Sequence, residues 1–491
     1  MNILKSEKKE IDPRHWQFFA STVVLGVFSA FCYFMQYSLI LPFFLFFLGI
    51  HFYYSNKADG RLVIHLGLIL TLLIALVYVA DYYFHLPHYV MPVAGVAMLS
   101  MLLFNNLHLT FLMALASSII ATSMLNGGFG LMFIYFLGGL TGAYAVRGAR
   151  TRGQMIGAGL FVSAVNVICL YLSFPSAQLI LHKNFGLEFV WPLVLNGFIA
   201  ASFVSATLKV FEMLFGMLTN FSLLELSDFN QPLLKRMIME APGTYHHSLV
   251  VSNLAEAAAD AIGANALLTR VGAYYHDIGK LSQPEYFTEN QLMGGNKHDK
   301  IEPSMSRLVI LNHVKEGIEL AKKYKLNQHI IDFIPQHHGT GLIHYFYQKS
   351  LEDAQEGETV DEETFRYPGP KPQTRETAIT LLADSVEGAT RALEDQSRVH
   401  LEETVKKVIN NKFIDGQLDE CPLTLKEIDK ISATFIRILS AMYHGRVKYP
   451  EKKNGVSKPK REGKNADRGL KSSEENPAQP QTDQNDHHGN S

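Results

Sequence analysis

The chain has few cysteines and no excess of charge of either sign. Its 491 residues include only three cysteines, which lie far apart at Cys32, Cys169 and Cys421. This excludes a disulfide scaffold, and the lack of close cysteine pairs argues against a structural zinc site. The formal net charge of −2 gives no general attraction to nucleic acid, and no basic arm or aromatic-and-arginine pattern indicates a polynucleotide partner.

Charged side chains are scarce in the first half of the chain. Residues 16–210 contain only ten Asp, Glu, Lys or Arg residues among 195 positions, which excludes a uniformly soluble enzyme. Apolar runs of about 20 residues can cross a hydrocarbon core of about 30 Å. The sequence predicts eight transmembrane helices, at 16–35, 38–54, 62–84, 89–104, 108–125, 128–146, 155–174 and 189–209. The first run is interpreted as a retained helix because further apolar runs follow it at once.

The positive charges predict the orientation of these helices. Lysines and arginines occur in residues 1–15, at Lys57 and Arg61 in the second loop, and at 147–152 in the sixth loop. Eight crossings place all three regions on one side, and an excess of Lys and Arg marks the cytoplasmic side. We therefore expect a multi-pass protein of a bacterial cell membrane, with the N-terminus and everything after Lys209 in the cytoplasm and the lipid bilayer as a partner.

The second half has a different composition. Residues 211–230 are expected to form a connector helix that continues the last membrane helix into water. Residues 231–450 show helical patterning without strand-like alternation, with Pro232 at a helix start and Gly263 at a helix end. Residues 451–491 contain no aromatic residue and are expected to be a disordered tail. The predicted fold class is all-α: a polytopic transmembrane helix bundle followed by a cytoplasmic all-helical domain.

Histidines and acids mark this second half as the site of chemistry. Nine of the twenty histidines fall between His246 and His344. Five separate elements stand out, each in or beside a predicted helix: His246-His247, His276-Asp277-Ile278-Gly279-Lys280, His313, His337-His338-Gly339 and Asp384. Helix bundles can direct such side chains into one shared cavity to hold metal ions. Two ions about 3.5–4 Å apart can share a water, lower its pKa and clamp both oxygens of an in-line displacement at phosphorus.

These elements resemble the HD superfamily of metal-dependent phosphohydrolases. The surrounding text is more similar still to the seven-transmembrane HD family of bacterial cyclic di-AMP phosphodiesterases, with Glu-Ala-Pro-Gly-Thr-Tyr-His-His-Ser-Leu, Tyr-His-Asp-Ile-Gly-Lys, Glu-Asn-Gln, Ile-Ile-Asp-Phe-Ile-Pro-Gln-His-His-Gly-Thr and Phe-Arg-Tyr-Pro-Gly-Pro-Lys-Pro-Gln. Members of that family usually carry a large extracellular domain after their first membrane helix. Here residues 36–37 alone separate the first two predicted runs, so that domain is expected to be lacking.

The resemblance implies a set of roles. One metal would be held by His247, His276, Asp277 and Asp384, and a second by Asp277, His313, His337 and His338, with Asp277 bridging. Imidazole with carboxylate suits iron, manganese or nickel, among which the sequence does not choose. Two divalent ions, Mn or Fe, are expected as cofactors. Asp277 and Lys280 are the candidate catalytic residues, and Lys280, Tyr245 and Tyr367 are the candidate substrate contacts. Thr244 is expected to cap the helix that carries Tyr245 and His247, and Lys280 to share a face with His276 and Asp277 if their helix is regular.

The implied activity is hydrolysis of cyclic di-AMP to pApA by a metal-bridging hydroxide, in second-messenger signalling. One alternative is a cyclic di-GMP phosphodiesterase of the related HD-GYP group, but that group has Gly-Tyr-Pro where this chain has Gly339-Thr340-Gly341. Another alternative is a non-catalytic nucleotide-sensing membrane receptor, which predicts lost ligands, whereas none is lost here. The sequence is compatible with a homo-oligomer.

Overall fold

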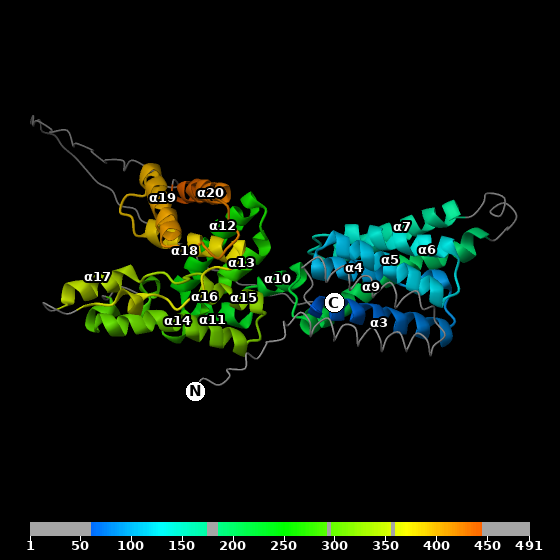
Figure 1. The fold of residues 1–491 in the computed structure, drawn as a ribbon, viewed down its shortest axis with the longest axis horizontal. Coiled ribbons are helices and arrows are strands. Elements are labelled where there is room, and N and C mark those ends of the chain that lie inside the picture. The colour runs from blue at the N-terminus through cyan, green and yellow to red at the C-terminus, as the bar shows by residue number, and fades with distance from the viewer. Residues whose placement is uncertain (1–59, 174–184, 292–295, 355–358, 444–491) are drawn as a thin grey trace, which may run out of the picture. The chain divides into compact units, whose positions relative to one another are not determined.

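The computed structural model describes residues 60–173, 185–291, 296–354 and 359–443 (Figure 1). Every regular element in these ranges is a helix, and one isolated β-bridge joins Leu342 to Arg366. The all-α fold class is therefore confirmed. The predicted helices at 16–35 and 38–54, the N-terminal segment 1–15 and the tail 451–491 lie outside the described residues.

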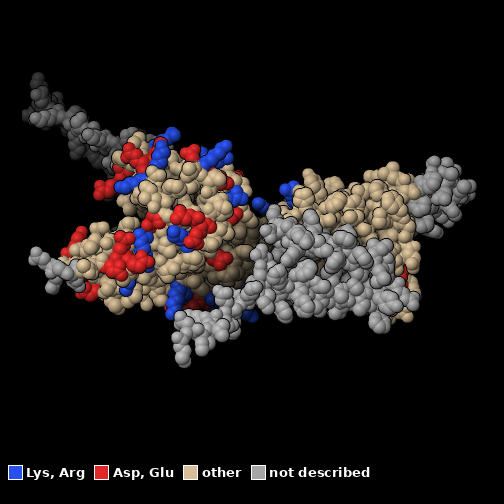
Figure 2. Space-filling model, in the orientation of Figure 1, with Lys and Arg blue, Asp and Glu red and all other residues tan. Residues whose placement is uncertain are grey.

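The first helical group corresponds to the predicted membrane region. It contains α3 (Gly60–Tyr82), η1 (His88–Val90), α4 (Ala94–Phe104), α5 (Leu107–Met124), α6 (Phe129–Ala145), α7 (Arg152–Ser173) and α9 (Phe185–Phe215). Four of these, α3, α5, α7 and α9, are long and apolar enough to cross a membrane, whereas η1 with α4 and α6 form shorter apolar helices. Figure 2 shows few charged side chains over the described part of this group and many over the helices that follow.

Small and amide side chains hold the first group together. At the crossing of α7 and α9, a Cβ atom on Gly197 would overlap the Gly159 carbonyl oxygen, so the two backbones approach as closely as glycine allows. Nearby, Asn196 donates hydrogen bonds to the carbonyl oxygens of Tyr89 (3.0 Å) and Met91 (2.6 Å). These bonds give an amide donor to one carbonyl oxygen within η1 and to one directly after it, where an apolar environment supplies no water as a donor.

The connector is interrupted, which corrects the expectation of one continuous helix. The last helix of the first group, α9, ends at Phe215, and Gly216 adopts a left-handed conformation (φ 66°) before α10 (Asn220–Leu226) begins. Only glycine adopts this conformation at little cost. The buried Glu212 carboxylate accepts hydrogen bonds across the break from the hydroxyls of Thr219 and Ser222, the latter at 2.6 Å. A hydrogen-bonded turn therefore separates the two helices.

The second helical group carries the predicted site. Its long helices are α11 (Pro232–Glu240), α12 (Pro242–Ile262), α13 (Ala266–Tyr275), α14 (Pro303–Lys323), α17 (His344–Asp353), α18 (Arg375–Arg391), α19 (Arg398–Ile414) and α20 (Leu425–Tyr443). The short ones are η2 (Ile278–Ser282), η3 (Pro284–Tyr286), η4 (Thr288–Asn290), η5 (Lys297–Lys300), α15 (Gln328–Ile331), α16 (Phe333–Gln336) and η6 (Glu362–Phe365). Helices α12, α18, α19 and α20 share one apolar core, while α11, α13, α14 and α15 contribute to another.

Local sequence signals explain where these helices start and stop. Gly263 ends α12 in a left-handed conformation (φ 68°), as predicted. Thr244, however, is not the N-cap of this helix, because α12 already begins at Pro242 with Ala241 as its cap. Proline favours the first helical position, where its missing N–H would have no partner in any case. Thr244 is buried inside the first turn instead.

Candidate metal centre

The structure brings together all seven side chains that the sequence predicted as metal ligands. They come from five segments: His247 on α12, His276 and Asp277 in the turn after α13, His313 on α14, His337 and His338 directly after α16, and Asp384 on α18.

One set of donor atoms surrounds one face of the Asp277 carboxylate. The Nε2 atoms of His247 and His276 lie 3.5 Å and 3.3 Å from Asp277 Oδ2. Asp384 Oδ1 lies 3.0 Å from His247 Nε2 and 3.8 Å from His276 Nε2. The ligand atoms of His247, His276 and Asp277 lie within 4.8 Å of one another, close enough to share one cation, and Asp384 adjoins this set through the two imidazoles.

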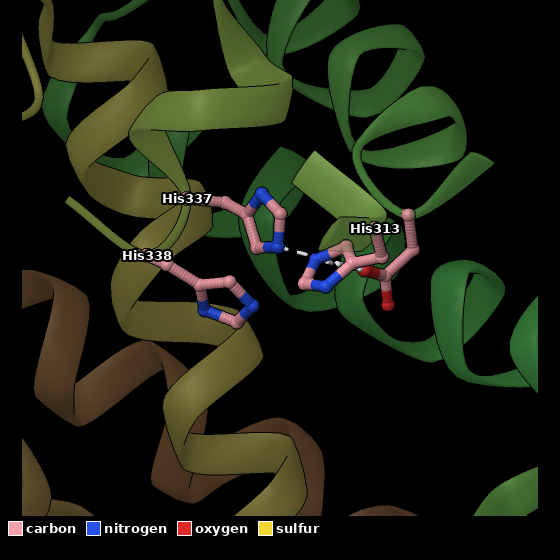
Figure 3. A group of neighbouring side chains, drawn as sticks. His313, His337 and His338 are labelled. Atoms are coloured by element: carbon pink, nitrogen blue, oxygen red, sulfur yellow. Dashed lines mark ion pairs between the residues drawn. The ribbon is translucent and has the colours of Figure 1, made fainter. Parts of the chain in front are cut away.

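A second set lies on the other oxygen of the same carboxylate. The Nε2 atoms of His313 and His337 both lie 3.5 Å from Asp277 Oδ1. Figure 3 shows the rings of His313, His337 and His338 turned toward one another. Ligand atoms of these three histidines and Asp277 lie within 4.8 Å of one another. Asp277 thus belongs to both sets, one oxygen in each, which is the arrangement of a bridging ligand.

Backbone hydrogen bonds orient the imidazoles. Three rings donate from Nδ1 to carbonyl oxygens in their own helical turn: His276 to Ala273 (2.7 Å), His313 to Ile310 (2.5 Å) and His337 to Phe333 (3.1 Å). A carbonyl oxygen can only accept, so Nδ1 carries the proton and Nε2 is left for a ligand bond. The Nε2 atoms of these three rings are buried without a hydrogen-bond partner. Buried polar atoms of native proteins are nearly always paired, which indicates that a cation belongs here.

The electrostatics fit a cation site. Burial alone would raise the pKa of the Asp277 carboxyl, but the Lys280 ammonium and the His276 imidazole hold that pKa well below its usual range. For Asp384, hydrogen bonds from His247 and His276 likewise outweigh burial and lower the pKa. Burial lowers the pKa of His313 to about 4. Both carboxylates are therefore ionised and His313 is neutral near pH 7, the states in which these groups bind metals. The same two carboxylates outweigh burial and raise the pKa of His276 to about 10, so this imidazole holds a proton that it would release on binding a cation.

Lys280 lies at the site, but it does not share one regular helix with His276 and Asp277. The helix is not regular, because α13 ends at Tyr275 and the tighter helix η2 begins at Ile278. The Lys280 ammonium lies 2.7 Å from Asp277 Oδ2 and 2.8 Å from Glu289 Oε1. Its charge is thus already paired with two carboxylates, the buried one of Asp277 and the partly buried one of Glu289.

The two tyrosines predicted as substrate contacts differ in position. Tyr367 stacks on the His338 ring with a centroid distance of 4.1 Å and an interplanar angle of 25°. Tyr245 instead packs edge-on against Phe229 at 5.6 Å and contributes to an apolar core. Residues two apart on a helix point in different directions, so Tyr245 does not share the face of His247. The structure therefore does not bring Tyr245 to the metal ligands.

Two acids near the site were missed from the sequence. Glu387 is buried on α18, and its Oε2 lies 2.6 Å from His247 Nδ1. It follows Asp384 by three residues, a spacing that places both on one helical face and could have revealed it. Glu289, on η4, accepts from Lys280 and from the Thr244 hydroxyl (3.3 Å). No periodic signal marks a residue of so short a helix.

A glycine in the His-Asp-Ile-Gly-Lys motif sets the distance between two of the segments. A Cβ atom on Gly279 would overlap the His313 carbonyl oxygen and approach the Gly317 amide within 2.6 Å. Only a residue without a side chain lets η2 and α14 approach this closely. The motif glycine thereby brings His313 up to Asp277.

Known proteins match the two helical groups separately. A family model described as "7TM receptor with intracellular HD hydrolase" matches residues 24–219, and the HD domain model matches residues 244–389. The first match and the four apolar helices indicate a membrane protein.

Curated relatives cover most of this chain. A cyclic-di-AMP phosphodiesterase, PgpH, of Bacillus subtilis is 38% identical over 411 residues, which are 80% of this chain and 56% of that protein. PgpH of Listeria monocytogenes is 43% identical over 66% of this chain and 45% of its own length. The crystal structure of the Listeria HD domain with cyclic-di-AMP is 50% identical, covers 44% of this chain and all of that one, and superposes with a TM-score of 0.43.

The chain spans about half the length of the curated relatives it matches. Its sequence is similar to those cyclic-di-AMP phosphodiesterases, and it combines a region that matches the 7TM receptor model with a region that matches the HD domain model.

Proposed function

We propose that the chain is a membrane-anchored phosphodiesterase that hydrolyses cyclic di-AMP to pApA. The observation that carries the hydrolase part is the convergence of five imidazoles on the two oxygens of Asp277, with Asp384 close to three of these rings. The likeness to phosphodiesterases named for cyclic di-AMP supports the choice of substrate.

The donor set suits two divalent cations such as Mn or Fe. His247, His276, Asp277 and Asp384 would hold one ion, and Asp277, His313, His337 and His338 the other. Nitrogen and oxygen donors without a thiolate favour such metals. When bound, the pair supplies Lewis acidity and a hydroxide formed from a shared water near neutral pH.

The residues of the chain position the reaction. Asp277 spans both donor sets, and Lys280 keeps that carboxylate ionised from a distance of 2.7 Å. The Tyr367 ring covers His338 and would border a substrate on that side. Hydrolysis adds water across one phosphorus–oxygen bond of the ring: the phosphate gains an oxygen, and the departing ribose oxygen takes a proton.

Product analysis on the full-length protein tests this proposal. The detergent-purified chain, loaded with Mn²⁺ under reducing conditions, is expected to convert cyclic di-AMP to pApA faster than it converts cyclic di-GMP to its linear product. Replacement of Asp277 by Asn should abolish the reaction. Replacement of the exposed His246, next to His247 on the same helix, by Ala should leave it intact. Faster turnover of cyclic di-GMP would overturn the substrate assignment.

The membrane topology is part of the proposal. The Lys and Arg distribution supports a cytoplasmic HD domain, where a cytoplasmic second messenger would reach it. A reporter fused after residue 443 that is active only in the cytoplasm should be active in cells. Activity of a periplasmic or external reporter there would contradict this orientation.

A further inference from the structure

One basic residue near the metal ligands was not predicted to have a role. Lys412 lies in the last turn of α19, beside the turn that follows His337 and His338. A Cβ atom on Gly341 would lie 3.2 Å from the Lys412 ammonium, and the Gly341 amide donates to the His338 carbonyl oxygen at 3.0 Å. The ammonium therefore lies next to the backbone that carries a predicted metal ligand.

Hydrogen bonds fix the end of α19 against this same turn. The Gln417 side chain accepts from the Thr340 amide at 2.9 Å and donates to the Thr340 hydroxyl at 3.0 Å. Gln417 is fully buried. These hydrogen bonds hold Gln417 in place, and they thereby fix the backbone that carries Lys412 five residues earlier.

The other basic residues around the site are already paired. Lys280 contacts Asp277 and Glu289. The remaining pairs join Arg366 to Glu362 (2.7 Å) and Asp415 (3.0 Å), and Lys371 to Asp419 (3.6 Å). Lys412 differs, because it makes no ion pair or hydrogen bond with any residue that the structure describes. Because Lys412 is only partly buried, its ammonium is free to bind an anion that enters from solvent.

Lys412 also lies toward the accessible side of the metal centre. Five of the seven ligand side chains are at most 5% exposed, whereas His338 is 22% and Asp384 14% exposed. Desolvation lowers the pKa of the Lys412 ammonium, and the largest opposing influence on that pKa comes from Asp384. By its position, the ammonium lies beside Gly341, in the turn that follows His338, the most accessible of the seven ligands.

We propose that Lys412 binds the second phosphate of the cyclic dinucleotide, the one that is not being hydrolysed. This inference rests on the proposed function. A cyclic dinucleotide carries two phosphodiester anions, and the metal centre accommodates only one of them at a time. The other needs a cation that is not already paired, and an ammonium suits it as a point charge on a flexible stem. Lys412 is such a cation, and it lies beside the turn that follows the partly exposed ligand His338.

Two substrates distinguish a contact to the second phosphate from a contact to the phosphate that is hydrolysed. Cyclic di-AMP has two phosphates, whereas bis(p-nitrophenyl) phosphate has one. In the full-length, Mn²⁺-loaded protein, Lys412→Gln is expected to lower kcat/KM for cyclic di-AMP by roughly 10- to 100-fold, mainly through KM, as loss of a hydrogen bond to a charged group does. Turnover of bis(p-nitrophenyl) phosphate should not change. Lys412→Arg should restore most of the loss, and Lys407→Gln, an exposed lysine on the same helix, should behave like the parent protein.

Equilibrium binding of cyclic di-AMP to the metal-free protein completes the test. Lys412→Gln should weaken this binding, and Lys407→Gln should not. Unchanged binding and turnover in Lys412→Gln, or an equal loss with both substrates, would overturn the inference. Lys412-dependent binding without any hydrolysis by the parent protein would instead overturn the proposed function and leave the phosphate contact standing.

Discussion

The His247 ring lies between carboxylates on both of its nitrogens. Glu387 Oε2 lies 2.6 Å from Nδ1, and Asp384 Oδ1 lies 3.0 Å from Nε2. A carboxylate on the far nitrogen of a metal-binding imidazole fixes its tautomer and orientation and raises its basicity. At Nδ1, His276, His313 and His337 contact a backbone carbonyl oxygen, whereas His247 contacts an acid. Glu387 is thus a positioning residue for the first cation.

Replacement of Glu387 tests this positioning role. Glu387→Ala is expected to weaken binding of one of the two metal ions by about 10- to 100-fold. Glu387→Gln keeps an acceptor for the Nδ1 proton and should lose less. Chelator competition on the purified protein measures both affinities. Glu394→Gln, an exposed acid just beyond the same helix, serves as the control. A metal affinity of Glu387→Ala equal to that of the parent would show that His247 does not need this acid.

At the scale of the elements, the contact between η2 and α14 decides whether the second cation site forms. Asp277 precedes η2, His313 lies on α14, and Gly279 lets the two segments touch. Because protein interiors are close-packed, an added methyl group there cannot be absorbed without moving a backbone.

A matched pair of glycine variants tests this contact. Gly279→Ala is expected to cost about 1–3 kcal/mol of stability through overpacking and to reduce metal content, since His313 is pushed away from Asp277. Gly388 lies on α18 with open space where a Cβ would be. Gly388→Ala should therefore be neutral or stabilise the protein by up to about 1 kcal/mol, because alanine favours a helix. Thermal unfolding and elemental analysis of both variants give the readout, and equal behaviour of the two would refute the close-approach argument.

The sequence predicted those features that depend on residue type and local spacing. Apolar runs marked the helices, and the histidine and aspartate motifs marked the candidate ligands, because metal binding requires those side chains. It did not predict the break at Gly216, the start of α12 at Pro242 or the position of Tyr245. These depend on how a backbone turns and which helical face packs inward. Glu387 shares a helical face with Asp384, but its contact with His247 on α12 exists only in the folded chain. The position of Lys412 beside Gly341 likewise depends on how α19 packs.

At the scale of the whole molecule, metal binding and folding are linked. The unpartnered Nε2 atoms and Asp277 Oδ1 are buried in the metal-free state, which costs free energy that a bound cation would recover. Addition of Mn²⁺ to chelator-treated protein should therefore raise the Tm, with about 2.7 kcal/mol of stabilisation at a metal concentration 100 times Kd. Asp277→Asn should lose most of this rise. A Tm that does not respond to any divalent metal would show that the buried nitrogens are not metal ligands.

The most direct test of the account is the metal content of the folded chain. The full-length protein, purified in detergent and reconstituted with Mn²⁺ or Fe²⁺ under reducing conditions, is examined by elemental analysis. We predict about two ions per chain, as expected for a two-metal site, and about one or none in Asp277→Asn. A folded parent protein that stays empty, or an Asp277→Asn variant that keeps both ions, would contradict the account.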